Sequence, residues 1–242
     1  MPSHDGLRPL KAWRYVGVYG PELMLCAAIV RIGRARQSFW AMWDHEHLME
    51  RTSLRATGVQ MRAGRLVIPE LCLDVRLDEE SGIETVSPSG ASYAWTRKQG
   101  GVRASGSLAD SVIDARAIID DTAGYYARYT SWRWSAGVGT ASDGRAVAWN
   151  LVDGVNDPPE QSERTIWIDG EPFEPPQSVF ATDLSGVDGL AFHAEAVRER
   201  NDNFLLVRSR YRQPFGTFSG ELPGGISLAN GYGVMEDHEA WW

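Results

Sequence analysis

Short stretches in which apolar and polar residues alternate, with turn residues between them, recur along nearly the whole chain. Residues 111–120 are a clear case. One face of this segment is apolar at a period of two and is expected to point into a core; it carries Ile113, Ala115, Ala117 and Ile119. Strands at such regular spacing, joined by tight turns, are typical of β-sandwiches and β-barrels. The sequence therefore predicts an all-β, antiparallel fold built from barrel-like sheets.

Glycine, proline, asparagine and aspartate mark the expected turns. Asp169-Gly170 is a type I′ hairpin signal, and Gly100-Gly101 predicts a second hairpin between strands at 92–98 and 102–107. Further turns are expected at residues 63–64, 142–144, 201–202 and 223–225. Two segments, 45–51 and 120–130, are the candidates for short helices.

The length of the chain bounds its domain organisation. Its 242 residues are enough for one large barrel or for two smaller barrels that share an interface. The chain has no exact internal repeat, and the segment around Asp120 lies near its midpoint. We expect two packed barrel-like halves, an N-terminal half at residues 1–119 and a C-terminal half at residues 120–242.

Charge and hydropathy exclude several classes of partner. The formal net charge is −8, and an acidic chain repels a phosphate backbone, so we expect no nucleic acid partner. The N-terminal residues lack the basic and apolar regions of a secretory signal. The longest apolar stretch, residues 23–30, is too short to cross a bilayer. We therefore expect no membrane span and a cytoplasmic location.

Motifs for several kinds of chemistry are missing from the sequence. It contains no GxSxG elbow, no P-loop and no HExxH, and its glycines do not mark a strand-to-helix switch. Cys26 and Cys72 lie in apolar runs and are expected to be small buried hydrophobes. His45 and His47 share a strand face, but without a third ligand nearby a solvated turn is the better interpretation. We predict no metal and no cofactor.

The aromatic content is unusually high, with 10 tryptophans. Tryptophan is large and stiff, so it suits either a β core or the wall of an apolar ligand pocket. Trp132 and Trp134 share one strand face at a period of two, with Arg133 on the other face. The candidate ligand-binding residues are Tyr125, Tyr126, Trp132, Arg133, Trp134, Trp149, Asn150 and Phe215. Core packing remains the alternative for the aromatic members of this set.

Carboxyl groups among aromatic rings are the candidates for chemistry. A carboxyl in an apolar pocket keeps its proton near neutral pH, and aromatic faces stabilise a cation. Asp120 and Asp121 lie close to such rings, although adjacent carboxylates before Thr and Ala-Gly also read as a helix cap or a turn. Glu236 and His238 form a second candidate pair, because strand geometry lets them converge.

Two further polar positions have an open role. Asn150 lies in an otherwise apolar strand, where a buried amide needs hydrogen-bond partners, so it either orients a ligand or satisfies backbone groups. Arg133 and Arg210 flank aromatic strands, and we expect them to pair with Asp120, Asp121 or Glu236 across a barrel mouth.

Four segments carry a resemblance to a known family. They are IDDTAGYYARYTSWRWSAGVG, GRAVAWNLVDGVND, YRQPFGTFSGELPGG and GYGVMEDHEAWW. From about Lys11 to Trp242 the chain resembles the domain of unknown function 2804, which looks related to the lipocalin-like group of AttH-like proteins and carotenoid 1,2-hydratases. The resemblance implies a pair of lipocalin-like barrels or half-barrels, and terpenoid-like ligands. It also implies additional sequence before Lys11 in other members, so the first half is expected to be truncated here.

Two functions remain open at this point, together with a third and simpler alternative. The first is a binding module that holds a lipid-like or terpenoid-like molecule in a barrel cavity. The second is a cofactor-free hydratase, isomerase or cyclase, in which Asp120, Asp121, Glu236 or His238 is the acid–base group. The third is a structural protein with a fully packed core. Whether a carboxyl with a raised pKa lines a cavity separates the first two. Aromatic patches on outward faces would suit a homodimer.

Overall fold

The computed structural model describes residues 1–54, 57–204 and 207–242. Strands dominate these residues, and their one helical element is the short 3₁₀ helix η1 (Pro69–Leu71). The strands form a 10-stranded sheet, an 8-stranded sheet and a small N-terminal pair, β1 (His4–Asp5) with β2 (Arg8–Pro9). The all-β, antiparallel prediction is confirmed.

The first sheet takes up the N-terminal half of the chain. Its order is β6-β5-β4-β3-β12-β11-β9-β8-β7, and β10 pairs with β11 beside this path. The strands are β3 (Lys11–Tyr19), β4 (Met24–Ile32), β5 (Ala35–Trp43), β6 (Leu48–Ser53), β7 (Gln60–Arg62), β8 (Arg65–Ile68), β9 (Leu73–Leu77), β10 (Ile83–Ser89), β11 (Ser92–Leu108) and β12 (Ser111–Gly124). Leu25 of β4 and Leu66 of β8 belong to one buried cluster, so this sheet curls around its own core.

The second sheet has the order β16-β15-β14-β13-β20-β19-β18-β17. The strands are β13 (Tyr129–Ala141), β14 (Ala146–Asp153), β15 (Thr165–Ile168), β16 (Glu171–Phe173), β17 (Gly186–Val187), β18 (Gly189–Phe204), β19 (Val207–Leu222) and β20 (Ile226–Trp241). Its outer face has a core of its own, to which Phe180 and Leu184 contribute from the segment between β16 and β17.

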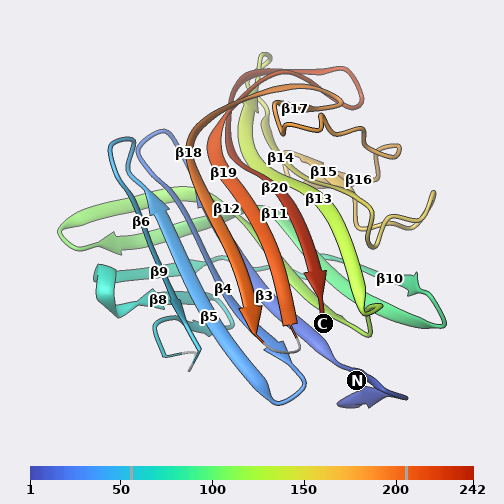
Figure 1. Cartoon of the computed structure of the whole chain (residues 1–242). Helices are drawn as coiled ribbons and strands as arrows, with labels where there is room; N and C mark the ends of the chain where they lie inside the picture. Colours follow the sequence, from blue (N-terminus) through green and yellow to red (C-terminus); the bar gives the residue numbers. More distant parts are fainter. Residues whose placement is uncertain (55–56, 205–206) are drawn as a thin grey trace.

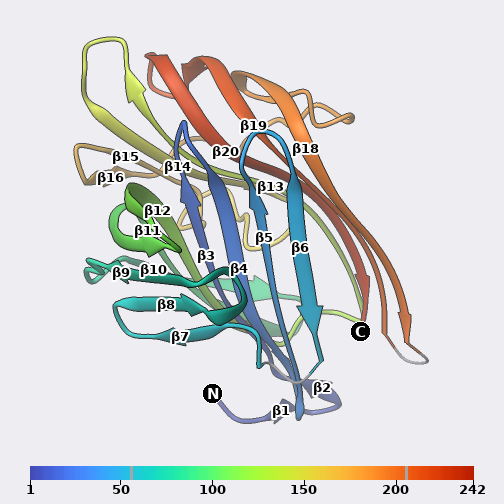
Figure 2. The same ribbon diagram turned by 90° about the vertical axis from the view of Figure 1, so that its left-hand side faces the viewer.

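A further core lies between the two sheets, where β13, β18, β19 and β20 cross β3–β5 (Figures 1 and 2). Tyr15 and Cys26 reach this core from the first sheet, and Trp134 and Phe215 reach it from the second. Tyr15 and Trp134 meet edge to face, with 5.2 Å between their ring centroids. The fold is thus two lipocalin-like halves packed face to face.

The continuous apolar run at residues 23–30 follows from this arrangement. Strand β4 is buried on both faces, with Leu25 in the core of the first half and Cys26 in the core between the sheets. Strands that are buried on both sides lose the alternation of apolar and polar residues. In β12 the apolar face predicted from the sequence is confirmed, because Ile113, Ala117 and Ile119 enter the core of the first half.

The chain passes from one sheet to the other in the segment 125–128, between β12 and β13. The expected domain boundary at 119/120 falls inside β12. Lys11 holds this connection in place: its buried ammonium donates to the carbonyl oxygen of Tyr126 at 3.0 Å and lies 4.7 Å from the ring centroid of Trp242.

Both helix predictions are wrong. Residues 48–53 form β6, and residues 120–124 continue β12, with Tyr125 and Tyr126 in the connection that follows. Asp120 and Asp121 therefore cap no helix. Strand pairing outweighs the local cap signal here, because β12 lies between β3 and β11 and pairs with both along this segment.

The turn predictions had a mixed outcome. The hairpin at Asp169-Gly170 is confirmed, with both residues at positive φ, and turns also occur at 63–64, 142–144 and 223–225. The hairpin at Gly100-Gly101 is wrong: β11 runs through both glycines, and the pair forms a bulge instead. The turn at 201–202 is wrong as well, because β18 continues to Phe204.

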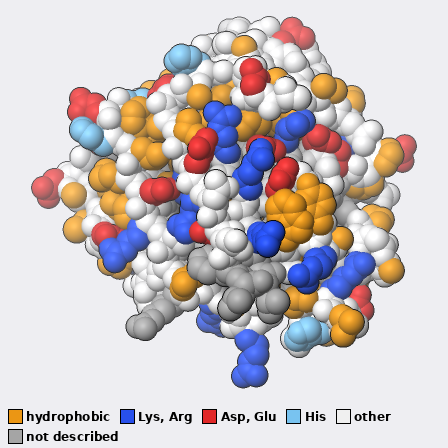
Figure 3. Space-filling model, viewed as in Figure 1, with side chains coloured by type: hydrophobic (Ala, Val, Ile, Leu, Met, Phe, Trp, Pro, Cys, Tyr) orange, Lys and Arg blue, Asp and Glu red, His pale blue; other side chains and the backbone are white. Residues whose placement is uncertain are grey.

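The surface drawn in Figure 3 has acidic and basic side chains interspersed with apolar ones. Such mixing of charges is ordinary for a solvated protein face. Within residues 1–54, 57–204 and 207–242, no helix has the length and apolar character that crossing a bilayer requires.

Gly137 tests the packing of the second half. A Cβ atom at this position would lie 2.2 Å from Cζ2 of Trp149, which is fully buried on the neighbouring strand. We expect Gly137→Ala to lower the free energy of unfolding by about 1–3 kcal/mol, because the core cannot expand around a rigid indole. Gly58→Ala is the control, since nothing lies within 4 Å of its Cβ position. Urea unfolding followed by far-UV circular dichroism measures both, and equal midpoints would contradict this packing.

Candidate functional site

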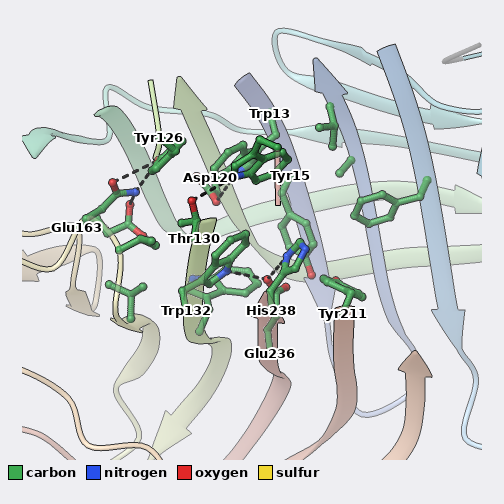
Figure 4. Close-up of a pocket in the computed structure, with 18 residues that line it drawn as sticks. Trp13, Tyr15, Asp120, Tyr126, Thr130, Trp132, Glu163, Tyr211, Glu236 and His238 are labelled. Carbon is green, nitrogen blue, oxygen red and sulfur yellow. Dashed lines mark hydrogen bonds and ion pairs between the residues drawn. The ribbon is translucent and has the colours of Figure 1, made fainter. Parts of the chain in front are cut away.

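A cavity lies between the two sheets, near the connection at 125–128. The space open to the centres of water molecules is about 120 Å³, which is far more than the roughly 10–15 Å³ needed by a single water. Its walls are mostly aromatic and aliphatic, with a few polar groups (Figure 4). They consist of Trp13, Tyr15, Ala28, Val30, Phe39, Asp120, Tyr126, Thr130, Trp132, Trp134, Val152, Val155, Asn156, Glu163, Tyr211, Glu236, His238 and Trp242.

Asp120 and Asp121 point to opposite sides of the first sheet. Asp120 lies on the face of β12 that looks toward the second sheet, and it lines the cavity. Asp121 pairs with Arg14 at 2.8 Å and with Arg97 at 2.7 Å, and does not line the cavity. The alternation of side chains along a strand therefore separates the two acids that are neighbours in sequence.

Asp120 belongs to a buried ion cluster that joins the two halves. Lys98 of β11 lies 2.7 Å from Asp120 Oδ1 and 3.3 Å from Glu163 Oε2, and all three side chains are buried. Asp120 also accepts from the hydroxyl of Thr122 at 2.7 Å and from the indole of Trp13 at 3.0 Å. Glu163 comes from the segment between β14 and β15, so the cluster bridges the sheets.

Glu163 carries the perturbed carboxyl of this cluster. Burial raises its pKa to about 6; the attraction of Lys98 opposes this shift and the charge of Asp120 adds to it. Burial alone would lower the pKa of Lys98, but the carboxylates of Asp120 and Glu163 outweigh burial and raise it. Glu163 therefore takes up a proton at a higher pH than an exposed glutamate does.

Glu236 and His238 form a second polar group in the wall, opposite Glu163 and close to Tyr211 (Figure 4). Their convergence on one face of β20 confirms the spacing argument. His238 Nδ1 lies 3.6 Å from Glu236 Oε1, and Nε2 lies 2.8 Å from the hydroxyl of Ser209. The Tyr211 hydroxyl is buried and makes no hydrogen bond of ordinary geometry, while burial and the nearby Glu236 raise the pKa of this phenol.

The tryptophans of the wall have paired N–H groups. Each donates its indole N–H to a protein acceptor, as buried tryptophans usually do. The pairs are Trp13 with Asp120 (3.0 Å), Trp132 with Glu236 (2.9 Å), Trp134 with Asn150 (2.8 Å) and Trp242 with Thr130 (3.1 Å). These hydrogen bonds fix the orientation of the rings, and two of them, from Trp13 and Trp132, go to the acids Asp120 and Glu236.

Of the eight candidate ligand-binding residues, Tyr126, Trp132 and Trp134 line the cavity. The others serve different contacts. Trp149 is in the outer core of the second half, Phe215 is packed between the sheets, and the Tyr125 hydroxyl donates to the carbonyl of Pro2. Asn150 supports the wall from behind, since it accepts from Trp134 and donates to the Glu163 carbonyl at 2.8 Å.

The arginines do not form the expected pairs. Arg133 faces away from the cavity, 4.0 Å from Asp153, and Arg210 lies 3.9 Å from Asp237. Neither contacts Asp120, Asp121 or Glu236, because both alternate out of the face that these strands turn toward the first sheet.

The histidines and cysteines singled out in the sequence can also be located in the structure. His45 lies in a turn at positive φ, with Nδ1 3.0 Å from Glu195, and His47 is exposed. Among the described residues, no three His, Cys, Asp or Glu side chains converge as metal ligands do. Cys26 is buried and free as expected, but Cys72 is exposed, because it ends η1 in a left-handed conformation.

Sequence reasoning missed several residues of the site, notably Lys98, Glu163, Trp13 and Tyr211. Lys98 has a signal that was available. It is one of only two lysines in an arginine-rich chain, and it lies inside a strand. Glu163 follows a Pro-rich loop and has no local pattern that distinguishes it from a surface residue.

These features define the class of the protein: two lipocalin-like β halves that enclose an aromatic cavity with acidic groups in its wall. Residues 57–174 match the model of the family described as domain of unknown function (DUF2804), which confirms the resemblance seen in the sequence over this part of the chain. No curated protein matches the chain by sequence.

Solved structures with related folds include kievitone hydratase from Nectria haematococca. It is 11% identical, with a TM-score of 0.52 over 94% of this chain and 88% of that one, a likeness of fold alone. A putative AttH from Nitrosomonas europaea is 13% identical, with a TM-score of 0.48 over 97% and 93% of the two chains. CghA with Sch210972 is 10% identical, with a TM-score of 0.48 over 99% and 92%.

The raised pKa of Glu163 predicts a pH-dependent stability. Its folded pKa of about 6 exceeds the ordinary 4.5, so the folded state holds the proton more tightly and is favoured at low pH. That stabilisation is fully present below about pH 4.5 and is lost as pH rises through about 6, a change of about 2 kcal/mol. Glu163→Gln removes this titration. The free energy of unfolding of both proteins is measured in urea at pH 4 and at pH 7.5. Relative to the native protein, the variant should be more stable at pH 7.5 than at pH 4 by about that amount. A difference between the two proteins that is the same at both pH values would contradict the assignment.

Proposed function

We propose that this protein binds an apolar small molecule, lipid-like or terpenoid-like, in the cavity between its two sheets. The observation that carries this proposal is the aromatic wall, in which tryptophan rings face open space and their N–H groups are bonded to protein acceptors. Sites for small molecules are mostly apolar, with a few polar groups that set orientation. Here Glu163 and Glu236 are such groups, at separate places in the wall.

Filling the cavity should abolish binding. Val155 lines it from the loop after β14, where a larger side chain can be placed without breaking a strand. We expect Val155→Trp to weaken binding of the neutral fluorophore N-phenyl-1-naphthylamine by at least about tenfold, because the indole occupies the ligand's space. Val112→Trp adds the same ring at a position that is 82% exposed, and it should bind like the native protein.

Two outcomes would count against the proposal. One is fluorophore binding that is equal in the two variants, which would place the ligand elsewhere. The other is a native mass spectrum of freshly purified protein that shows a clean apo mass, together with no uptake from a lipid extract. A stoichiometric apolar molecule in that spectrum would support the proposal and supply a ligand for further tests.

A second candidate function is acid–base conversion of the bound molecule by a cofactor-free hydratase, isomerase or cyclase. The specific observation in its favour is a carboxyl with a raised pKa, Glu163, in an aromatic wall. A protein named kievitone hydratase shares the fold, so the fold is compatible with such chemistry. In a hydration, the Glu163 carboxyl would give its proton to a carbon–carbon double bond. Water would then add to the cation and return a proton to the carboxylate.

The roles of the other acids follow from their partners. Asp120 accepts from Lys98, Thr122 and Trp13, so most of its acceptor capacity is used within the protein. Its charge would help to hold the proton on Glu163. Glu236 and His238 would stabilise charge or accept a proton elsewhere in the cavity. Asp121 is no longer a candidate acid–base group, because it faces away from the cavity.

The test uses the apolar molecule recovered from the purified protein, incubated with fresh enzyme and analysed by mass spectrometry. Hydration adds the mass of one water, whereas isomerisation or cyclisation changes retention time without changing mass. We expect Glu163→Gln to lower the rate by at least about 100-fold while binding persists. The native rate should fall as pH rises above about 6, because the acid form is lost. An unchanged rate in this variant would exclude Glu163 as the acid.

A further inference from the structure

The cavity wall offers a ligand more hydrogen-bond acceptors than donors. The indole donors of its four tryptophans are bonded to protein acceptors, as described above. The Thr130 hydroxyl donates to the carbonyl of Ala127 at 3.1 Å, and the Tyr15 hydroxyl pairs with that of Tyr19 at 2.8 Å. The Tyr126 hydroxyl and the Asn156 amide bond to each other, and the amide also donates to Glu163. Beyond these, the wall has the Tyr211 hydroxyl and the ring of His238, which contacts Ser209 and Glu236. Few donors remain for a ligand.

Acceptors, by contrast, remain available. A carboxylate has about four acceptor sites. Glu236 receives hydrogen bonds from Trp132 and from Gln213, at 2.9 and 3.0 Å. Glu163 receives one from Asn156 at 3.0 Å and contacts Lys98 at 3.3 Å. Both carboxylates line the cavity with part of their capacity unused, at separate places in the wall.

The charged side chains that line the cavity are mainly acidic. Asp120, Glu163 and Glu236 line the cavity, and among its lining residues there is no lysine or arginine. Lys98 is committed to Asp120 and Glu163. The other cations nearby lie behind aromatic rings of the wall. Lys11 is held by the Tyr126 carbonyl behind Trp242, and Arg198 stacks on Phe39, 4.0 Å from its centroid, and pairs with Glu50 at 2.7 Å.

We infer that the natural ligand of this cavity carries a protonated amine on its apolar body, and that the cavity rejects carboxylates such as fatty acids. This inference rests on the proposed function and names the chemical class of the ligand. An ammonium group supplies both donors and positive charge, so it can bond to Glu236 or Glu163. Trp13, which stacks on Tyr126, and Trp132, which packs against His238, line the cavity beside these acids and would add cation–π stabilisation of the same charge. A carboxylate would meet like charge and few free donors.

Two matched series of probes test this inference by isothermal titration calorimetry at pH 7.5. One has a compact apolar body (adamantan-1-amine, adamantan-1-ol, adamantane-1-carboxylate), and the other an extended body (decylamine, decan-1-ol, decanoate) below its critical micelle concentration. In the series whose body fits, we expect the amine to bind at least about tenfold more tightly than the alcohol. The alcohol should in turn bind more tightly than the carboxylate.

Variants then locate the interaction. Glu236→Gln keeps the size and the acceptor oxygen but removes the charge, so amine binding should weaken about tenfold while alcohol binding changes by less than about threefold. Glu84→Gln is the matched control, because Glu84 also accepts an indole N–H, from Trp95 at 3.0 Å, but lies outside the cavity. The control should bind all probes as the native protein does. Circular dichroism and the unfolding midpoint verify that each variant is folded.

The outcomes separate this inference from the proposed function. If an alcohol or a carboxylate binds as tightly as the matching amine, the inference is wrong while apolar binding stands. If the amine is preferred but Glu236→Gln and Glu163→Gln both leave its affinity unchanged, the site lies elsewhere and the inference is also wrong. If none of the six probes binds, the proposed function fails and the inference fails with it.

Discussion

The buried ion cluster of Lys98, Asp120 and Glu163 connects the two halves at the point where the cavity forms. A buried ammonium that lacks a partner is unstable by several kcal/mol, so Lys98 requires a carboxylate within contact distance. Asp120 supplies one from the neighbouring strand at 2.7 Å, and Glu163 supplies a second from the other half at 3.3 Å. When the second half packs against the first, Glu163 therefore becomes the second carboxylate partner of Lys98. The same docking gives the cavity its charged wall.

Pairing between strands explains how tryptophans and acids come to share this wall. On one face of an antiparallel sheet, directly opposite and diagonal residues lie within reach of long side chains. Trp132 is opposite His238 and Trp134 is opposite Glu236, so the Trp132 indole can reach Glu236 along the diagonal. In the first sheet Asp120 is opposite Tyr15, and Trp13 reaches it in the same way. The pairing of neighbouring strands thus places aromatic rings and carboxylates next to one another on the face that lines the cavity.

Periodicity and turn chemistry predicted the class of fold and part of the site. The period of two placed Trp132 with Trp134, and Glu236 with His238, on common faces, since a strand imposes this locally. It could not tell which face meets the other half, so Trp149 and Asn150 were assigned to the ligand but belong to the core and the support of the wall. Glu163 was beyond reach, because its burial depends on a contact with Lys98 across 65 residues of sequence.

The position of the cavity between the halves has a chemical consequence. The described cores of both halves are filled with apolar side chains, such as Leu25 and Leu66 in one and Phe218 and Met235 in the other. Both sheets line the cavity, with Asp120 on one side and Glu236 on the other, so a ligand bound there as proposed would meet groups from both. On the proposed function, neither half alone would orient the ligand, and a small change in how the sheets dock would alter selectivity without any change in the lining residues. Because Glu163 reaches Lys98 across the interface and burial raises its pKa, protonation of this carboxyl would weaken a contact that holds the two halves together.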